Sequence, residues 1–133
     1  MRGLDTNVLL RFLLADDRRQ FVAAKAAIAH AISAGEPLLV SLLAILETEW
    51  VLRSSAGLAK TEILRIFKKL LESGDLAFES EVVIEDALVR FEKSNADFAE
   101  CLMMAHYQHL GCSAMLTFDV KASKMPGVEL LSA

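Results

Sequence analysis

The residues best able to do chemistry in this chain are carboxylates in unexpected places. Asp5 directly follows the first short apolar segment, and Asp119 directly follows the apolar run 114–118. Glu47 has apolar neighbours at helical spacing, and a carboxylate on such a face needs a partner or a cation because burying it alone is costly. Carboxylate oxygens are hard ligands, which suit Mg²⁺ or Mn²⁺. We therefore expect these acids to contribute to a site for a divalent cation.

Asp97 and Glu100 form a further candidate pair. They are three residues apart, which places both side chains on one face of a helix. The same spacing is that of a capping box, in which Asp97 would cap the helix and Glu100 would reach back to the backbone. Both roles can coexist for Asp97. Capping is also an alternative explanation for Asp5 and for Asp119, since each precedes a turn or a helix.

Other chemistry has weaker support in the sequence. His106 and His109 are three residues apart and lack the H-E-x-x-H pattern of a zinc site. The chain contains no dinucleotide-binding glycine motif, no P-loop and no G-x-S-x-G motif. Glu49 is assigned to a surface ion pair with Arg53, which follows it by four residues. Oxygen-ligated metal chemistry is therefore the strongest reading.

Short apolar segments alternate with longer amphipathic segments along the chain. Strands are expected at 1–4, Leu38–Ser41, Leu76–Phe78, Ala114–Phe118 and Val128–Leu131. Helices are expected at Asn7–Leu14, Arg18–Ser33, Leu42–Ser54, Thr61–Glu72, Ile84–Phe91 and Asp97–Leu110. This alternation predicts an α/β fold with a parallel sheet and helices on both faces. Because the carboxyl ends of parallel strands meet at one edge, Asp5 and Asp119 are expected on that edge.

Size, charge and cysteine content narrow the class of protein. The chain has 133 residues, of which 54% are apolar, so a single domain over residues 1–133 is expected. The net charge of −4 argues against a simple nucleic-acid-binding module. It does not argue against an enzyme that binds phosphate groups through metal ions. Cys101 and Cys112 are interpreted as reduced core thiols of a cytoplasmic protein. No apolar run reaches the length of a membrane span.

Four stretches together carry a family resemblance. They are LDTNVLLRFLL, SLLAILETEWVLR, ADFAECLMMAHYQHLGC and MLTFDVKASKMPGVELL, and they span nearly the whole chain. The chain resembles PIN-domain ribonucleases, most closely the VapC-like toxins of prokaryotic toxin–antitoxin pairs. The resemblance implies a three-layer domain with a parallel sheet of about five strands flanked by helices.

The resemblance also implies a metal-dependent endoribonuclease in which water attacks an RNA phosphodiester and leaves a 5′-phosphate. The residues matching the family's acids, and so the implied Mg²⁺ or Mn²⁺ ligands, are Asp5, Glu47, Asp97, Glu100 and Asp119. Glu100 stands where the family usually has Asp, which leaves open whether Asp97 or Glu100 is the primary ligand. The residues implied to orient these acids are Thr6, Asn7 and Thr117, and the implied RNA contacts are Arg11, Lys121 and Lys124, for which ordinary surface charge is the alternative.

The expected partners are the RNA substrate, a second copy of the chain in a homodimer, and a small VapB-like antitoxin. Three alternatives stay open. The chain could be a PIN nuclease of RNA processing with no antitoxin, or a PIN interaction domain whose site is degraded at Glu100. A phosphohydrolase or receiver-type domain using Asp5 ranks last, because Asn7 stands where a second acid would be needed.

Overall fold

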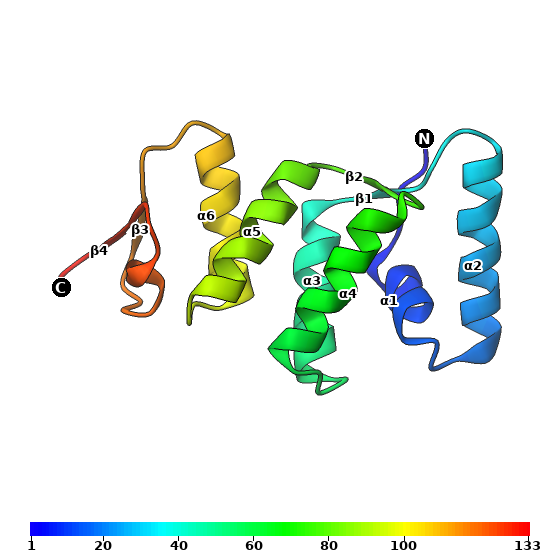
Figure 1. The fold of residues 1–133 in the computed structure, drawn as a ribbon, viewed down its shortest axis with the longest axis horizontal. Helices are drawn as coiled ribbons and strands as arrows, with labels where there is room; N and C mark the ends of the chain where they lie inside the picture. The colour runs from blue at the N-terminus through cyan, green and yellow to red at the C-terminus, as the bar shows by residue number, and fades with distance from the viewer. The chain divides into compact units, whose positions relative to one another are not determined.

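The computed structural model describes residues 1–133 and divides them into two compact units, Met1–Glu79 and Ser80–Ala133 (Figure 1). Each unit has its own helices and its own pair of strands, and a single domain over residues 1–133 stays a prediction. The first unit contains α1 (Thr6–Leu14), α2 (Arg18–Ser33), β1 (Leu39–Val40), α3 (Leu42–Ser54), α4 (Lys60–Ser73) and β2 (Ala77–Phe78). The second contains α5 (Glu81–Lys93), α6 (Phe98–His109), β3 (Met115–Thr117), the 3₁₀ turn η1 (Ala122–Lys124) and β4 (Val128–Leu130).

The strands of the first unit are short and parallel. Leu39 pairs with Ala77 in β2 and also forms an isolated parallel bridge with Gly3. The Leu4 amide donates to the Leu39 carbonyl at 2.8 Å, and the Leu39 amide donates to the Arg2 carbonyl at 2.9 Å. The predicted first strand is thus a single bridge, because the chain turns into α1 immediately after Leu4.

Helix packing supplies the core of the first unit. Helix α1 packs against α2 and α3, and α3 packs against α4. The amphipathic helix predicted at Thr61–Glu72 is present as α4, whose apolar stripe buries Ile63, Leu64, Phe67 and Leu70. Removing water from such a stripe stabilises the fold by about 1.5–3 kcal/mol for each large side chain. The core therefore holds the N-terminal segment and the start of α1 in place.

In the second unit α5 and α6 pack against each other, and β3 pairs with β4 in parallel. The rings of Phe91 and Phe98 meet edge to face at 5.4 Å between centroids. The Arg90 guanidinium donates to the Gln108 side chain at 2.6 Å and to the Pro126 carbonyl at 3.0 Å. It therefore joins α5, α6 and the segment before β4.

The prediction of an α/β fold with parallel strand pairing is confirmed, since both strand pairs are parallel and helices separate their strands. Within the first unit β1 pairs with β2, and within the second β3 pairs with β4, so a single sheet of about five strands stays a prediction. The interpretation of both cysteines as core thiols is wrong for Cys112, which is exposed after the end of α6, whereas Cys101 is buried. No helix is both long and apolar enough to cross a membrane.

Ala15, which ends α1, gives a prediction for stability. Its backbone is left-handed, with φ 51° and ψ 31°, a conformation that costs an L-residue about 1–2 kcal/mol and costs glycine nothing. We expect Ala15→Gly to raise the free energy of unfolding by about 1 kcal/mol. This value allows for the greater conformational entropy that glycine gives to the unfolded chain.

Ala34 supplies the matched control, because it ends α2 in the right-handed region with φ −81°. Ala34→Gly should lower the free energy of unfolding by about 0.5–1 kcal/mol. Urea denaturation of the two variants measures both effects. Equal losses in the two variants would contradict the left-handed backbone at Ala15.

Candidate functional site

Asp5 lies at the junction between the N-terminal segment and α1. It occupies the cap position of α1 with an extended backbone, and yet its side chain accepts no capping hydrogen bond. The side chain is exposed. Asp is a favoured cap residue because its carboxylate accepts from the first free amides of a helix. Capping therefore does not account for the Asp5 carboxylate, which remains available to a ligand.

Asp97 repeats this arrangement at the start of α6. It occupies the cap position with an extended backbone, and its exposed side chain accepts no capping hydrogen bond. The capping-box interpretation of Asp97 and Glu100 is therefore wrong for the Asp97 side chain. In both units a helix begins at an aspartate whose carboxylate the helix leaves unused.

Glu100 and Asp119 are electrostatically coupled within the second unit. Burial raises the pKa of Glu100, and the neighbouring negative charges of Asp119 and Asp97 and a side-chain hydrogen bond with Asp119 raise it further. The Glu100 Oε2 atom is buried and has no hydrogen-bond partner. A buried carboxylate oxygen without a partner, beside two other acids, is costly unless a proton or a cation compensates it.

The turn after β3 fixes the position of Asp119. Its Oδ1 accepts from the Lys121 amide at 2.8 Å and from the Ala122 amide at 3.1 Å. The Thr117 hydroxyl oxygen in turn accepts from the Asp119 amide at 3.0 Å. The turn-capping role considered for Asp119 is thus present, and it uses only one of the two carboxylate oxygens. Thr117 orients the Asp119 backbone.

The faces of α3 differ from the sequence interpretation. Glu47 is exposed, whereas Glu49 is only 2% exposed and accepts a 3.0 Å hydrogen bond from Arg53 Nε. The ion pair was predicted correctly, but its placement on the surface was wrong, as was the burial expected for Glu47 among its apolar neighbours. The exposed face carries Leu43 and Trp50, so apolar spacing selected the wrong side of the helix.

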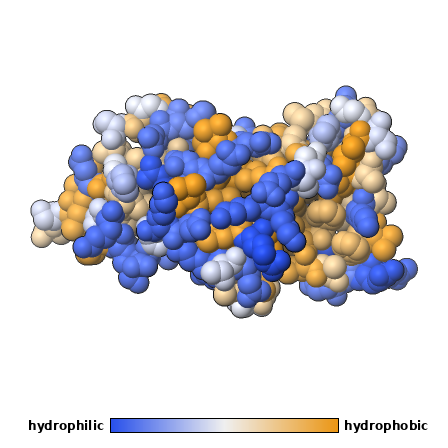
Figure 2. Space-filling view, viewed as in Figure 1, coloured by the Kyte–Doolittle hydropathy of each residue, from blue (hydrophilic) through white to orange (hydrophobic).

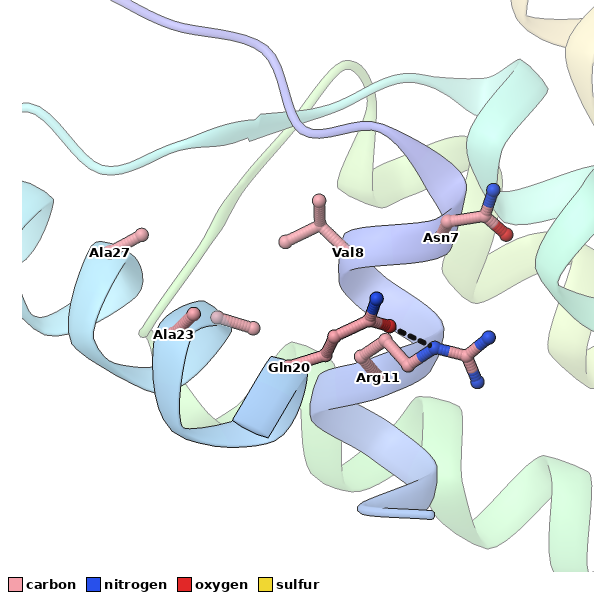
Figure 3. Close-up of a pocket in the computed structure, with 7 residues that line it drawn as sticks. Asn7, Val8, Arg11, Gln20, Ala23 and Ala27 are labelled. Carbon is pink, nitrogen blue, oxygen red and sulfur yellow. Dashed lines mark hydrogen bonds between the residues drawn. The ribbon is translucent and has the colours of Figure 1, made fainter. Parts of the chain in front are cut away.

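Thr48 is a polar residue that sequence reasoning missed. It is fully buried in α3, and its Oγ1 has no hydrogen-bond partner. Thr6, implied to orient the acids, is also buried, at the start of α1. Asn7 is exposed and lines a groove of about 380 Å³ with Val8, Arg11, Gln20 and three alanines of α2 (Figure 3).

The cations implied to contact RNA differ in their surroundings. Arg11 donates to the Gln20 side chain at 2.7 Å (Figure 3), and it pairs with Asp16 at 2.9 Å. These bonds tie α1 to the start of α2, so Arg11 has a structural role. Lys121 and Lys124 lie exposed in the turn after Asp119. An RNA contact by any of the three stays a prediction.

The five predicted acids divide between the two units. Asp5 and Glu47 belong to the first unit, and Asp97, Glu100 and Asp119 belong to the second. No three His, Cys, Asp or Glu side chains form a group ready to hold a metal ion. In the second unit, Glu100 interacts with the charges of Asp119 and Asp97 and forms a side-chain hydrogen bond with Asp119.

Two features of the second unit suit a divalent cation. The donors are all carboxylate oxygens, which are the ligands that Mg²⁺ and Mn²⁺ prefer. The unpartnered Oε2 of Glu100 lies in a locally negative environment, which a cation would neutralise. The residues present therefore fit such an ion.

The fold and these acids define an α/β domain with carboxylates at the junctions between strands and helices. The family model of the PIN domain matches residues 4–128, and the chain belongs to this family. PIN domains are generally nucleases, so the fold is of the nuclease type. No curated protein and no solved structure matches the chain.

The raised pKa of Glu100 predicts how stability changes with pH. Because this pKa lies above its ordinary value of 4.5, the folded protein binds a proton at Glu100 more tightly than the unfolded chain. Wild-type stability should then fall as pH rises from 4.5 through the raised pKa. Gln has no charge to bury, so Glu100→Gln should become progressively more stable than wild type over this interval, and the difference should level off above it.

Urea denaturation at several pH values, in excess chelator, measures this difference. The control is Glu85→Gln, which removes an exposed carboxylate on α5 and should give a flat difference. A Glu100→Gln protein that is no more stable than wild type at neutral pH would contradict the cost assigned to this half-buried carboxylate.

Proposed function

We propose that this PIN domain is a metal-dependent endoribonuclease that hydrolyses RNA phosphodiester bonds, and that it is the toxin of a type II toxin–antitoxin pair. The observation that carries the catalytic part is the buried, unpartnered Oε2 of Glu100 beside Asp119 and Asp97. The unused carboxylates at the caps of α1 and α6 add to it. The VapC-like resemblance of the sequence supports the toxin role, with a VapB-like antitoxin and a homodimer as expected partners.

We also propose that the five parallel segments form one sheet. Leu116 and Phe118, in and just after β3, are 59% and 69% exposed, whereas parallel sheets are normally covered on both faces. Pairing of β3 beside the N-terminal segment would form one sheet, and helices packed on its faces would cover such residues. It would also bring Asp5 and Asp119, which follow neighbouring strands, to the same edge.

In this proposal Asp5, Glu47, Asp97, Glu100 and Asp119 hold one or two Mg²⁺ or Mn²⁺ ions. Such an ion lowers the pKa of water and stabilises negative charge on a phosphodiester. Asp119 keeps its orientation through the two amides that bind its Oδ1. Thr117 fixes the backbone of Asp119, and Thr6 and Asn7 would do the same for Asp5.

The proposal predicts that cleavage of a labelled RNA requires a divalent cation. Excess EDTA should abolish cleavage, and adding Mn²⁺ or Mg²⁺ beyond the chelator should restore it, because the carboxylates alone cannot offset charge on the phosphate. Gel analysis should show products with a 5′-phosphate. Undiminished cleavage in EDTA would refute the mechanism.

Variants at single acids complete this experiment. Asp5→Asn should lower turnover by orders of magnitude and leave the thermal midpoint of the metal-free protein unchanged or higher, since its side chain caps nothing. Asp75→Asn, in the segment before β2 of the same unit, is the control and should retain activity. An Asp5→Asn protein that unfolds would instead assign Asp5 a structural role.

A further inference from the structure

Helix α2 carries a charged surface that the proposed cleavage site does not use. Residues Arg18–Ser33 contain Arg18, Arg19 and Lys25 and no acidic residue, although the chain as a whole has a net charge of −4. All three cations are exposed. The helix is therefore a local concentration of positive charge on an acidic protein.

The cations lie beside apolar side chains on a concave surface. Arg18, Val22, Lys25 and Ala29 follow each other at spacings of four, three and four residues, which places them on one face of the helix. With Phe21 and Ala26 they line a hollow of about 430 Å³. We call these six residues the α2 surface. Figure 2 shows mainly hydrophobic residues over α2, with hydrophilic residues gathered near the end where the helix begins.

The Phe21 ring is held within this surface. It stacks on Phe12 of α1, with centroids 6.4 Å apart and planes at 16°. The Lys25 Nζ lies 5.9 Å from the Phe21 centroid. Because Lys25 has a flexible stem and is exposed, its ammonium can move to an anion and leave the ring face to another planar group.

The fold does not account for the cations. Arg11 and Arg90 pair with carboxylates, whereas no carboxylate pairs with Arg18, Arg19 or Lys25. Arginines in the first turn of a helix also oppose the helix dipole, which favours acids there. The Asp17 carboxylate caps the helix by accepting from the Gln20 amide at 3.0 Å, but no ion pair joins it to either arginine, so an external anion would compensate the two charges.

We propose that the α2 surface binds single-stranded RNA outside the cleavage site. Arg18 and Lys25 would contact backbone phosphates, and Phe21 and Val22 would contact a base between them. The two cations are seven residues apart, or about 10 Å along the helix axis, which leaves room for a base between two phosphate contacts. Cations that follow the backbone, combined with an aromatic platform for bases, are the usual means of binding single strands.

An acidic protein segment fits the α2 surface less well. Its lining has no hydroxyl or amide side chain that could bind a peptide backbone, whereas phosphates and base faces need only cations and apolar contact. The inference rests on the proposed function, since RNA is the proposed substrate. Asp5 and Arg18 are separated by the whole of α1, which is about 13 Å long. The α2 surface should thus affect RNA binding and not the chemical step.

Binding is measured by the fluorescence anisotropy of a labelled oligouridylate of about 12 nucleotides, in excess EDTA so that no cleavage occurs. Arg18→Gln with Lys25→Gln should raise Kd about 25-fold at about 0.1 M salt and flatten the slope of log Kd against log salt by about 1.4, because two phosphate contacts are lost. Phe21→Leu keeps an apolar side chain but loses the stacking platform, and should raise Kd about tenfold.

The matched control is Arg65→Gln with Lys69→Gln, two exposed cations on α4 of the same unit. It changes the net charge equally and should leave Kd nearly unchanged. With Mn²⁺ present, the α2 pair should raise KM and leave kcat unchanged. Binding that depends on α2 without any cleavage would refute the proposed function but support the α2 surface.

Three results would overturn the inference. The first is an unchanged Kd for the α2 pair. The second is an equal loss of binding in the α2 and α4 pairs, which would indicate net charge alone. The third is displacement of the RNA by polyglutamate at a similar concentration, with polyglutamate binding lost in the α2 pair, which would assign the surface to an acidic protein segment.

Discussion

The partial burial of the Glu100 carboxylate beside the acids Asp119 and Asp97 is the constraint on which the candidate site depends. Burial of Glu100 and the charges beside it raise the pKa of this residue, and its Oε2 has no partner. The fold nevertheless holds the acids in place. The Lys121 amide binds Asp119, and α6 begins at Asp97. A group of acids that the fold holds close together without a ligand is suited to bind a cation, because the cation neutralises their negative charges.

Much of the fold follows from local sequence patterns. The apolar segments predicted near residues 39, 77, 115 and 128 are all strands, because each is short, apolar and bounded by turn residues. The stripe of α4 is clear because charged residues separate its apolar ones. Which strands pair with each other could not be predicted from these local patterns. Strands of two or three residues carry too little register information to specify their neighbours from pattern alone.

The candidate site residues were selected from the sequence by type and position, whereas their surroundings could be predicted only in part. Position at a strand end selected Asp5 and Asp119 as candidates, and the chain does enter α1 directly after Asp5 and turn directly after Asp119. Burial on α3 was inverted, because Trp50 and Leu43 are apolar and yet exposed, while Glu49 is buried through its pairing with Arg53. The periodicity of apolar residues reports hydrophobicity alone. It carries no information on an ion pair that allows a carboxylate to be buried.

The most direct test of the metal site uses the paramagnetic broadening of backbone amide resonances by substoichiometric Mn²⁺. If the acids of both units hold the same ions, amides next to Asp5, Glu47, Asp97, Glu100 and Asp119 should broaden together, and excess Mg²⁺ should reverse the effect. Amides of the exposed acids Glu62 and Glu85, on α4 and α5, should stay sharp. Broadening spread equally over all exposed acids, or confined to one unit, would contradict a shared catalytic metal site.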